Sequence, residues 1–135
     1  MEQRAKLLFA AFILFSLVGC RPESPPVQRS NVIDDVELSD ILANPKQFDH
    51  VRLRVKGIVR IEFEANSLYS DRDSMTARKW KNAIWLDLGW PVKDDLQQLN
   101  GRDVVVDGTF DASRTGHEGA YVGSMVAISK LSPTP

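Results

Sequence analysis

Hydrophobic and polar residues alternate through VRLRVKGIVRIEF, residues 51–63, more regularly than anywhere else in the chain. Every second position from Val51 is apolar or glycine, and most of the intervening positions are charged. A period of two is typical of a β-strand with one buried and one solvated face. A straight strand of this length would be longer than one small sheet can accommodate. We therefore predict one long strand that bends at Gly57, where a missing Cβ permits a bulge or the close approach of another backbone.

Four more strands are predicted by apolar runs between turn signals, at residues 68–69, 82–88, 102–111 and 120–131. The 102–111 segment repeats the pattern of the first strand on a smaller scale, with Gly108 near a second bend. Residues 70–81 are rich in both charges and lack alternation, so we expect an exposed loop there.

Two short helices are predicted beside the strands. The first falls within residues 36–48, with Ser39 as its N-cap and Pro45 at its end. The second covers residues 92–99, where Val92 and Leu96 are four residues apart. The order helix, three strands, helix, two strands is that of a mainly β, five-stranded OB-fold-like Greek-key barrel. A four- or six-stranded roll is the alternative.

The segments FDHVRLRVKGIVR, GRDVVVDGTFD and GHEGAYVGSMVAI together resemble small bacterial OB-like domains, including those grouped as anticodon-binding-like. The resemblance covers about seventy per cent of the chain, from Leu38 to Leu131. Many such domains are uncharacterised lipoproteins, so the resemblance implies a barrel without implying a specific activity.

The N-terminus carries Arg4 and Lys6 followed by an apolar run over residues 7–18, which is too short for a bilayer span and is typical of a secretory signal. It ends in Leu17-Val18-Gly19-Cys20, which resembles the lipobox of bacterial lipoprotein precursors. The resemblance implies that residues 1–19 are a signal peptide, removed after Gly19, and that Cys20 is acylated. An uncleaved signal anchor is the alternative.

Cys20 is the only cysteine, so no intramolecular disulfide can stabilise the protein. By the sorting rule of the lipoprotein family, Arg21 after the cysteine implies the outer membrane, on its periplasmic side. Residues 20–35 are rich in proline and serine and are predicted to be a tether. The barrel is then expected over residues 36–131.

The charge balance argues against a polyanion-binding protein. The chain has 17 basic and 18 acidic residues, for a formal net charge of −1, which gives no global field to attract nucleic acid. Basic residues at alternate positions of the first strand form a stripe, which we interpret as a solvated strand face: Arg52, Arg54, Lys56 and Arg60. The alternative is a site for lipid phosphates or an acidic partner.

Candidate ligand-binding residues are aromatic or lie in a glycine-bracketed loop. Trp85, Trp90 and Tyr69 could present a stacking surface, although a small barrel also needs such side chains to fill its interior. His117 and Glu118, in the sequence GHEG, belong to the loop between the last two strands, which borders the ligand face in OB-folds.

Positive support for catalysis is weak. Glu62 and Glu64 are two residues apart, so they share a strand face and are a candidate carboxylate pair or, with Asp87, a cation site. No nucleophile elbow, phosphate loop or metalloprotease motif occurs. With two histidines in the chain, zinc ligation is poorly supplied. We expect no metal and no cofactor.

The functional expectation is a lipid-anchored module of the cell envelope that binds another envelope protein. The alternative is a glycan-binding module or a glycan-active enzyme that uses Glu62, Glu64 and His117. In the binding interpretation the ligand residues are Tyr69, Trp85, Trp90, His117 and Glu118.

Overall fold

The computed structural model describes residues 32–135. The predicted signal peptide, Cys20 and most of the predicted tether therefore lie outside the described residues. The strands are β1 (Ile33–Val36), β2 (Arg52–Arg60), β3 (Ser67–Tyr69), β4 (Ala83–Leu86), β5 (Asp103–Asp111) and β6 (Ser124–Pro133). The α-helices are α1 (Leu38–Ala43), α2 (Arg72–Thr76) and α3 (Asp94–Gln97), and the 3₁₀ helices are η1 (Pro45–Phe48), η2 (Trp80–Asn82) and η3 (His117–Gly119).

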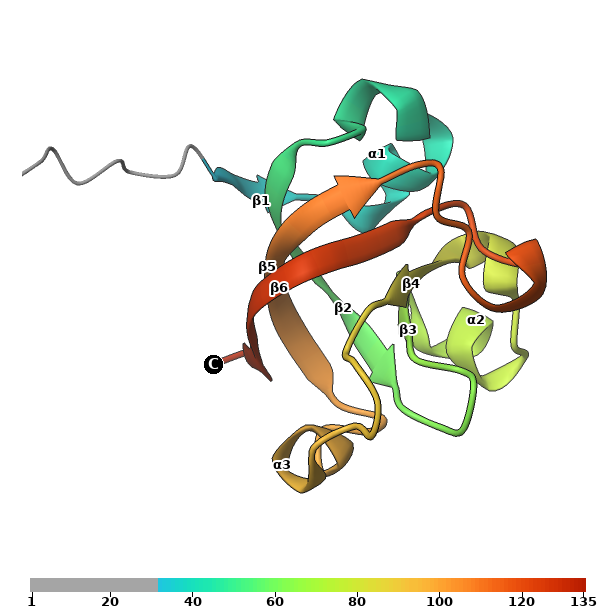
Figure 1. Ribbon diagram of the computed structural model, residues 1–135, viewed down its shortest axis with the longest axis vertical. Coiled ribbons are helices and arrows are strands. Elements are labelled where there is room, and N and C mark those ends of the chain that lie inside the picture. Colours follow the sequence, from blue (N-terminus) through green and yellow to red (C-terminus); the bar gives the residue numbers. More distant parts are fainter. Residues whose placement is uncertain (1–31) are drawn as a thin grey trace, which may run out of the picture.

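Five of the strands close into a barrel (Figure 1). Strands β2, β3 and β4 form an antiparallel meander, β4 runs parallel to β6, and β6 and β5 are antiparallel. Seven residue pairs between β2 and β5, from Arg52↔Thr109 to Ile58↔Asp103, then close the barrel. This pairing, with a helix between the third and fourth barrel strands, confirms the predicted OB-like Greek-key barrel.

Strand β1 is an addition to the five-stranded barrel. It runs parallel to β2 and pairs with Leu53 and Val55, whereas β3 pairs with the last three residues of β2. Because β5 occupies the other edge of β2, β1 and β3 must follow one another along a single edge. The strand spans Ile33–Val36 and so overlaps the end of the predicted tether, residues 20–35.

The alternation in β2 produces the predicted buried face. Leu53, Val55 and Val59 are fully buried, whereas Arg54, Lys56 and Gly57 between them are partly or fully exposed; Ile58, which breaks the alternation, is also buried. A Cβ at Gly57 would lie 2.7 Å from both Leu68 Cγ and the carbonyl oxygen of Tyr69. The predicted close approach of another backbone at this glycine is therefore confirmed.

Helices cover the two ends of the barrel (Figure 1). Ile41 of α1 is fully buried, and Leu42 and Phe48 pack partly buried against the same core. At the other end, Val92 and Leu99 on either side of α3 join this core. Both predicted helices are thus present, and α3 is shorter than the predicted 92–99.

Several predicted boundaries were wrong because tertiary contacts set them. Strand β2 ends at Arg60 instead of residue 63, since the Ile61 N–H donates to the side chain of Asn100 at 2.8 Å rather than to a strand. Phe63 consequently leaves the buried row and is exposed. Helix α1 begins at Leu38 with Glu37, not Ser39, at its N-cap. Strand β6 begins only at Ser124, four residues later than predicted.

The predicted exposed loop over residues 70–81 contains helical structure. Helix α2 begins after Asp71, whose carboxylate accepts hydrogen bonds from the Ser74 backbone N–H at 2.7 Å and from the Ser74 hydroxyl at 2.8 Å. These bonds lower the pKa of Asp71. The spacing Asp-x-x-Ser is an N-cap signal that the lack of alternation obscured.

Candidate functional site

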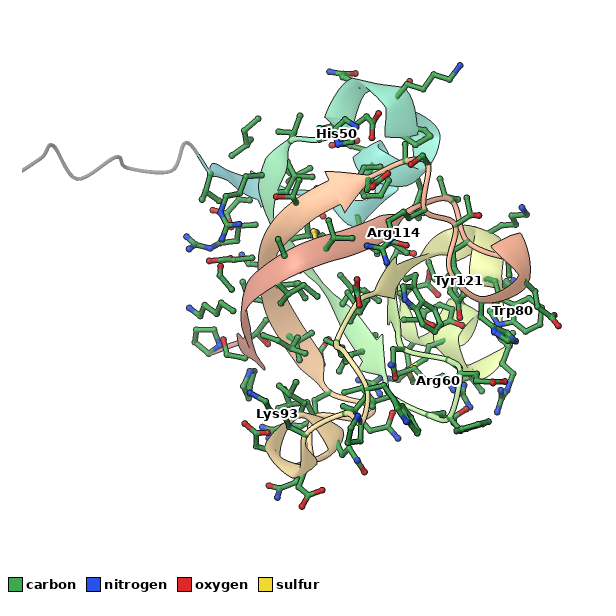
Figure 2. All side chains as sticks on the ribbon, viewed as in Figure 1. His50, Arg60, Trp80, Lys93, Arg114 and Tyr121 are labelled. Atoms are coloured by element: carbon green, nitrogen blue, oxygen red, sulfur yellow. The ribbon has the colours of Figure 1, made fainter. Side chains whose placement is uncertain are left out.

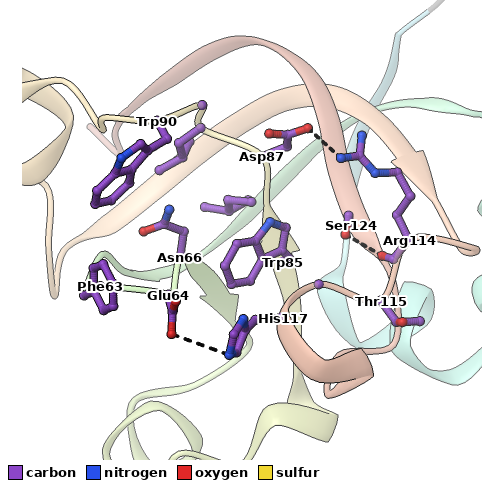
Figure 3. A pocket seen from close by; sticks show the side chains of 14 residues that line it. Phe63, Glu64, Asn66, Trp85, Asp87, Trp90, Arg114, Thr115, His117 and Ser124 are labelled. Carbon is purple, nitrogen blue, oxygen red and sulfur yellow. Dashed lines mark hydrogen bonds and ion pairs between the residues drawn. The ribbon is translucent and has the colours of Figure 1, made fainter.

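A pocket of about 730 Å³ opens on the side of the barrel, between the loop that follows β2 and the loop that follows β5 (Figure 3). Its lining comes from Phe63, Glu64 and Asn66, from residues 85–90, from residues 114–117 and from Ser124. The pocket thus collects side chains from three regions that are far apart in sequence, residues 63–66, 85–90 and 114–124. Its size falls within the range of about 300–1,000 Å³ that is usual for small-ligand sites.

Two exposed aromatic rings form one side of the pocket. Phe63 and Trp90 are each 74% exposed, and their ring centroids lie 5.8 Å apart at an interplanar angle of 74°. Phe63 extends from the turn after β2, and Trp90 follows Gly89, which has a φ of 74°. An edge-to-face pair covers little of either ring, so both keep apolar surface available to a ligand.

The opposite side of the pocket rests on Trp85. Its ring packs against Tyr121 at 5.5 Å and 63°, and the Tyr121 hydroxyl shares a buried hydrogen bond of 2.7 Å with Ser67. Burial raises the pKa of Tyr121. A Cβ at Gly116 would lie 2.7 Å from Tyr121 and 2.9 Å from Trp85, so glycine is what allows this loop to lie directly on the two rings.

Charged side chains of the pocket are paired with one another. Arg114 lies 3.1 Å from the carboxylate of Asp87, and the Arg114 carbonyl accepts a hydrogen bond from the Ser124 hydroxyl. His117 Nε2 lies 3.6 Å from the carboxylate of Glu64 (Figure 3). The lining therefore holds two carboxylates and one guanidinium, a net charge of −1 when His117 is neutral.

Asn66 lies between the two aromatic sides of the pocket (Figure 3). The residue is 7% exposed, and its Oδ1 atom has no hydrogen-bond partner among the residues that the structure describes. Its backbone carbonyl accepts from the Leu86 N–H at 2.9 Å, which fixes the residue against β4. The pocket wall therefore contains a buried acceptor that no described protein group uses.

Glu62 and Glu64 are not brought together as a carboxylate pair. Glu62 is held by Arg60 at 2.7 Å and by Arg78 at 3.2 Å, and the hydrogen bond from Arg60 lowers the pKa of Glu62. A turn closed by the bond from the Ala65 N–H to the Glu62 carbonyl separates the two side chains. Only Glu64 lines the pocket.

The predicted ligand residues divide into two groups. Trp85, Trp90 and His117 line the pocket. Tyr69, expected on the ligand surface, is instead buried with Ala83 and Tyr121 in a second cluster, where burial raises its pKa. Glu118 is not among the residues that line the pocket; its side chain is largely exposed, and its carboxylate lies 3.8 Å from Nε2 of His117.

The basic stripe on β2 is matched by acceptors on neighbouring elements. Arg54 makes two hydrogen bonds of 2.8 Å to Asp107, and Lys56 lies 3.3 Å from Asp35. Arg60 binds Glu62, and Arg52 donates to the Ser129 hydroxyl. Three of the four cations are thus paired with carboxylates, and Arg52 bonds to a neutral hydroxyl.

Residues 32–135 contain neither a cluster of metal-ligating side chains nor a membrane-spanning helix. No group of three or more His, Cys, Asp and Glu side chains in this part of the chain is arranged to hold a metal ion. In the same residues, no helix has the length and apolar character needed to cross a membrane.

The sequence analysis did not single out Phe63, Asn66 or Arg114 as pocket residues, and it named Asp87 only for a possible cation site. Phe63 was assigned to the core because it continues the alternation of β2. Asn66 belongs to Ala65-Asn66-Ser67, a turn signal between the first two predicted strands, and that turn is the sequence feature that could have directed attention to it. Comparison of the chain with protein-family models, with curated proteins and with solved structures finds no match.

Proposed function

We propose that this protein is a binding module of the bacterial cell envelope, anchored to the outer membrane through an acylated Cys20, and that its barrel binds a neutral glycan in the pocket. The observation that carries the glycan assignment is the exposed Phe63–Trp90 pair beside hydrogen-bonding side chains in a pocket of about 730 Å³. The lipobox-like segment supports the anchor and the location.

Sugars bind to surfaces that combine these two kinds of group. The C–H face of a pyranose ring packs on an aromatic side chain, while its hydroxyl groups need fixed donors and acceptors at the ring edge. Trp90 and Phe63 supply the apolar surface, and Asn66, Asp87 and Arg114 supply the polar groups. The pocket also adjoins the strands and loops with which OB-folds bind oligosaccharides.

Ionic pairing within the lining favours a neutral ligand. Arg114 is engaged by Asp87, and Glu64 lies beside His117, so the pocket has no excess of positive charge. A polyanion would need such an excess, because phosphate contacts depend on Lys and Arg. Binding without catalysis is favoured because Glu62 is held outside the pocket by two arginines.

An envelope protein is the second candidate ligand. The specific observation in its favour is that two large aromatic side chains, Phe63 and Trp90, are adjacent and mostly exposed. Such pairs are typical of the central contacts in protein interfaces.

Calorimetric titration of the full chain in mild detergent tests the proposal, with cellobiose and N,N′-diacetylchitobiose as neutral glycan probes. We expect heat of binding that Trp90→Ala reduces and that Trp80→Ala, outside the pocket lining, leaves unchanged. If neither sugar binds, while a photocrosslinker at position 63 captures one envelope protein in intact cells and Trp90→Ala prevents the capture, the second candidate is correct. Mass spectrometry of the N-terminal peptide tests acylation of Cys20.

A further inference from the structure

The unused acceptor of Asn66 defines the chemistry of the ligand more narrowly than the aromatic rings do. Leaving a buried amide oxygen without a partner destabilises a folded protein. Asn66 is 7% exposed, its Oδ1 is without a partner among the described residues, and its amide lies in the pocket between Trp90 and Trp85 (Figure 3). A ligand that donates a hydrogen bond at this point would satisfy the atom.

The surroundings of Asn66 favour an amide N–H over a hydroxyl as that donor. Trp85, Leu86 and Leu88 give this part of the lining an apolar character. A hydroxyl carries two acceptor lone pairs on the donating atom itself, whereas an amide nitrogen carries none and the carbonyl oxygen of the amide lies farther from the donor. An acetamido group also adds a methyl group, which gains from contact with apolar side chains.

We infer that the ligand is an N-acylated amino sugar, whose amide N–H donates to Oδ1 of Asn66 while its pyranose ring packs on Trp90 and Phe63. This inference rests on the proposed glycan-binding function and specifies the sugar class. It is consistent with the internally paired charges of the pocket, since an N-acylated amino sugar is neutral, whereas a free amino sugar is a cation.

Two disaccharides with the same linkage test the inference. N,N′-diacetylchitobiose and cellobiose differ only in carrying an acetamido group or a hydroxyl at C2 of each ring. Calorimetric titration of the full chain in mild detergent should give an affinity about tenfold higher for the acetylated sugar, the usual effect of one buried hydrogen bond. Asn66→Ala should remove this preference. Asn82→Ala is the matched control, because Asn82 lies outside this pocket and bonds to Ser74.

The remaining outcomes separate this inference from the proposed function. Equal affinities for the two sugars would overturn the inference and leave the glycan-binding function standing. A preference for the acetylated sugar that persists in Asn66→Ala would also overturn the inference, because a group other than Asn66 would then recognise the acetamido group. Absence of binding for both sugars up to about 10 mM, the range of very weak sites, would overturn both proposals.

Discussion

The imidazole of His117 lies 3.6 Å from the carboxylate of Glu64, and this contact joins the two loops on either side of the pocket. Glu64 follows β2, and His117 begins the 3₁₀ helix η3 between β5 and β6. Glu64 has a φ of 57°, a left-handed conformation that is uncommon for a residue other than glycine. The two loops therefore meet through the side chain of Glu64, a residue whose backbone conformation is restricted.

We expect the Glu64–His117 contact to contribute little to stability and to be sensitive to salt. Both side chains are about half exposed, and exposed ion pairs contribute about 1 kcal/mol or less. A double-mutant cycle with Glu64→Gln and His117→Ala, measured by chemical denaturation, should give a coupling of about 0.5 kcal/mol at low salt. It should vanish at about 1 M salt, where screening is strong. A coupling unaffected by salt would contradict an ionic contact. His50→Ala is the control, since His50 lies outside the pocket lining.

Replacing Trp90 should affect binding and not folding. The side chain is 74% exposed and packs against the equally exposed Phe63, so Trp90→Ala removes little buried surface. Loss of a central aromatic contact typically weakens binding by about 1–2 kcal/mol. Titration with N,N′-diacetylchitobiose should show this loss while the thermal unfolding midpoint stays unchanged. Trp80 is 47% exposed and lies outside the pocket lining (Figure 2). The control variant Trp80→Ala should therefore leave the affinity unchanged.

Asn66 and Asn100 should respond to truncation in opposite directions. The Oδ1 atom of Asn66 is buried and unbonded among the described residues, so Asn66→Ala should leave the free energy of unfolding unchanged or raise it by about 1 kcal/mol. The Oδ1 atom of Asn100 accepts from the Ile61 N–H at 2.8 Å, so Asn100→Ala should lower it by about 1 kcal/mol. Urea denaturation measures both. Equal destabilisation would mean that Asn66 has a structural role.

The barrel could be predicted because each long strand has a pattern of apolar and polar residues within its own sequence. Alternation in β2, with a glycine at position 57, reflects one buried face and one more exposed face. In β5 the alternation predicted the strand but not its burial, because residues 104–108 are buried on both faces. Strand ends depend on distant partners instead. The end of β2 is set by Asn100, about forty residues later, and Phe63 therefore leaves the core row although its spacing fits that row.

The pocket could be predicted only in part for the same reason. Trp90 and His117 stood out because tryptophan and histidine are uncommon residue types. His117 also lies in a loop between two glycines. Arg114 and Asp87 are paired across two loops, and neither has a sequence neighbour that signals the contact. The unused Asn66 acceptor is a property of burial and of missing partners, which no local pattern encodes.

Substituting the central glycine of β2 should destabilise the barrel. A Cβ on Gly57 would lie 2.7 Å from the Leu68 side chain and equally close to the Tyr69 carbonyl oxygen. The side chain could shift, but the carbonyl belongs to β3, which pairs with both β2 and β4. Gly57→Ala should therefore lower the free energy of unfolding by about 1–3 kcal/mol, the usual cost of overpacking. An unchanged midpoint in urea would show that β3 can move away from β2.

The Arg54–Asp107 pair should make the barrel less stable in acid. Two hydrogen bonds of 2.8 Å join the guanidinium to the buried carboxylate across β2 and β5. The bonds from Arg54 hold the pKa of Asp107 below its usual range. Because the folded pKa is the lower one, the stabilisation is present above the ordinary carboxyl pKa of about 3.9 and is lost as the pH falls through the folded value.

Asp107→Asn tests this dependence. At neutral pH the variant should lose about 1.5–3 kcal/mol of unfolding free energy, the range for a hydrogen bond to a charged group. The difference from the parent protein should shrink below about pH 4, since the parent carboxylate is then becoming protonated. Asp103→Asn removes an exposed carboxylate 3.3 Å from Arg72 and should cost less than about 1 kcal/mol. If the Asp107→Asn deficit stayed constant down to about pH 2, the pair would stabilise the barrel through packing rather than through charge.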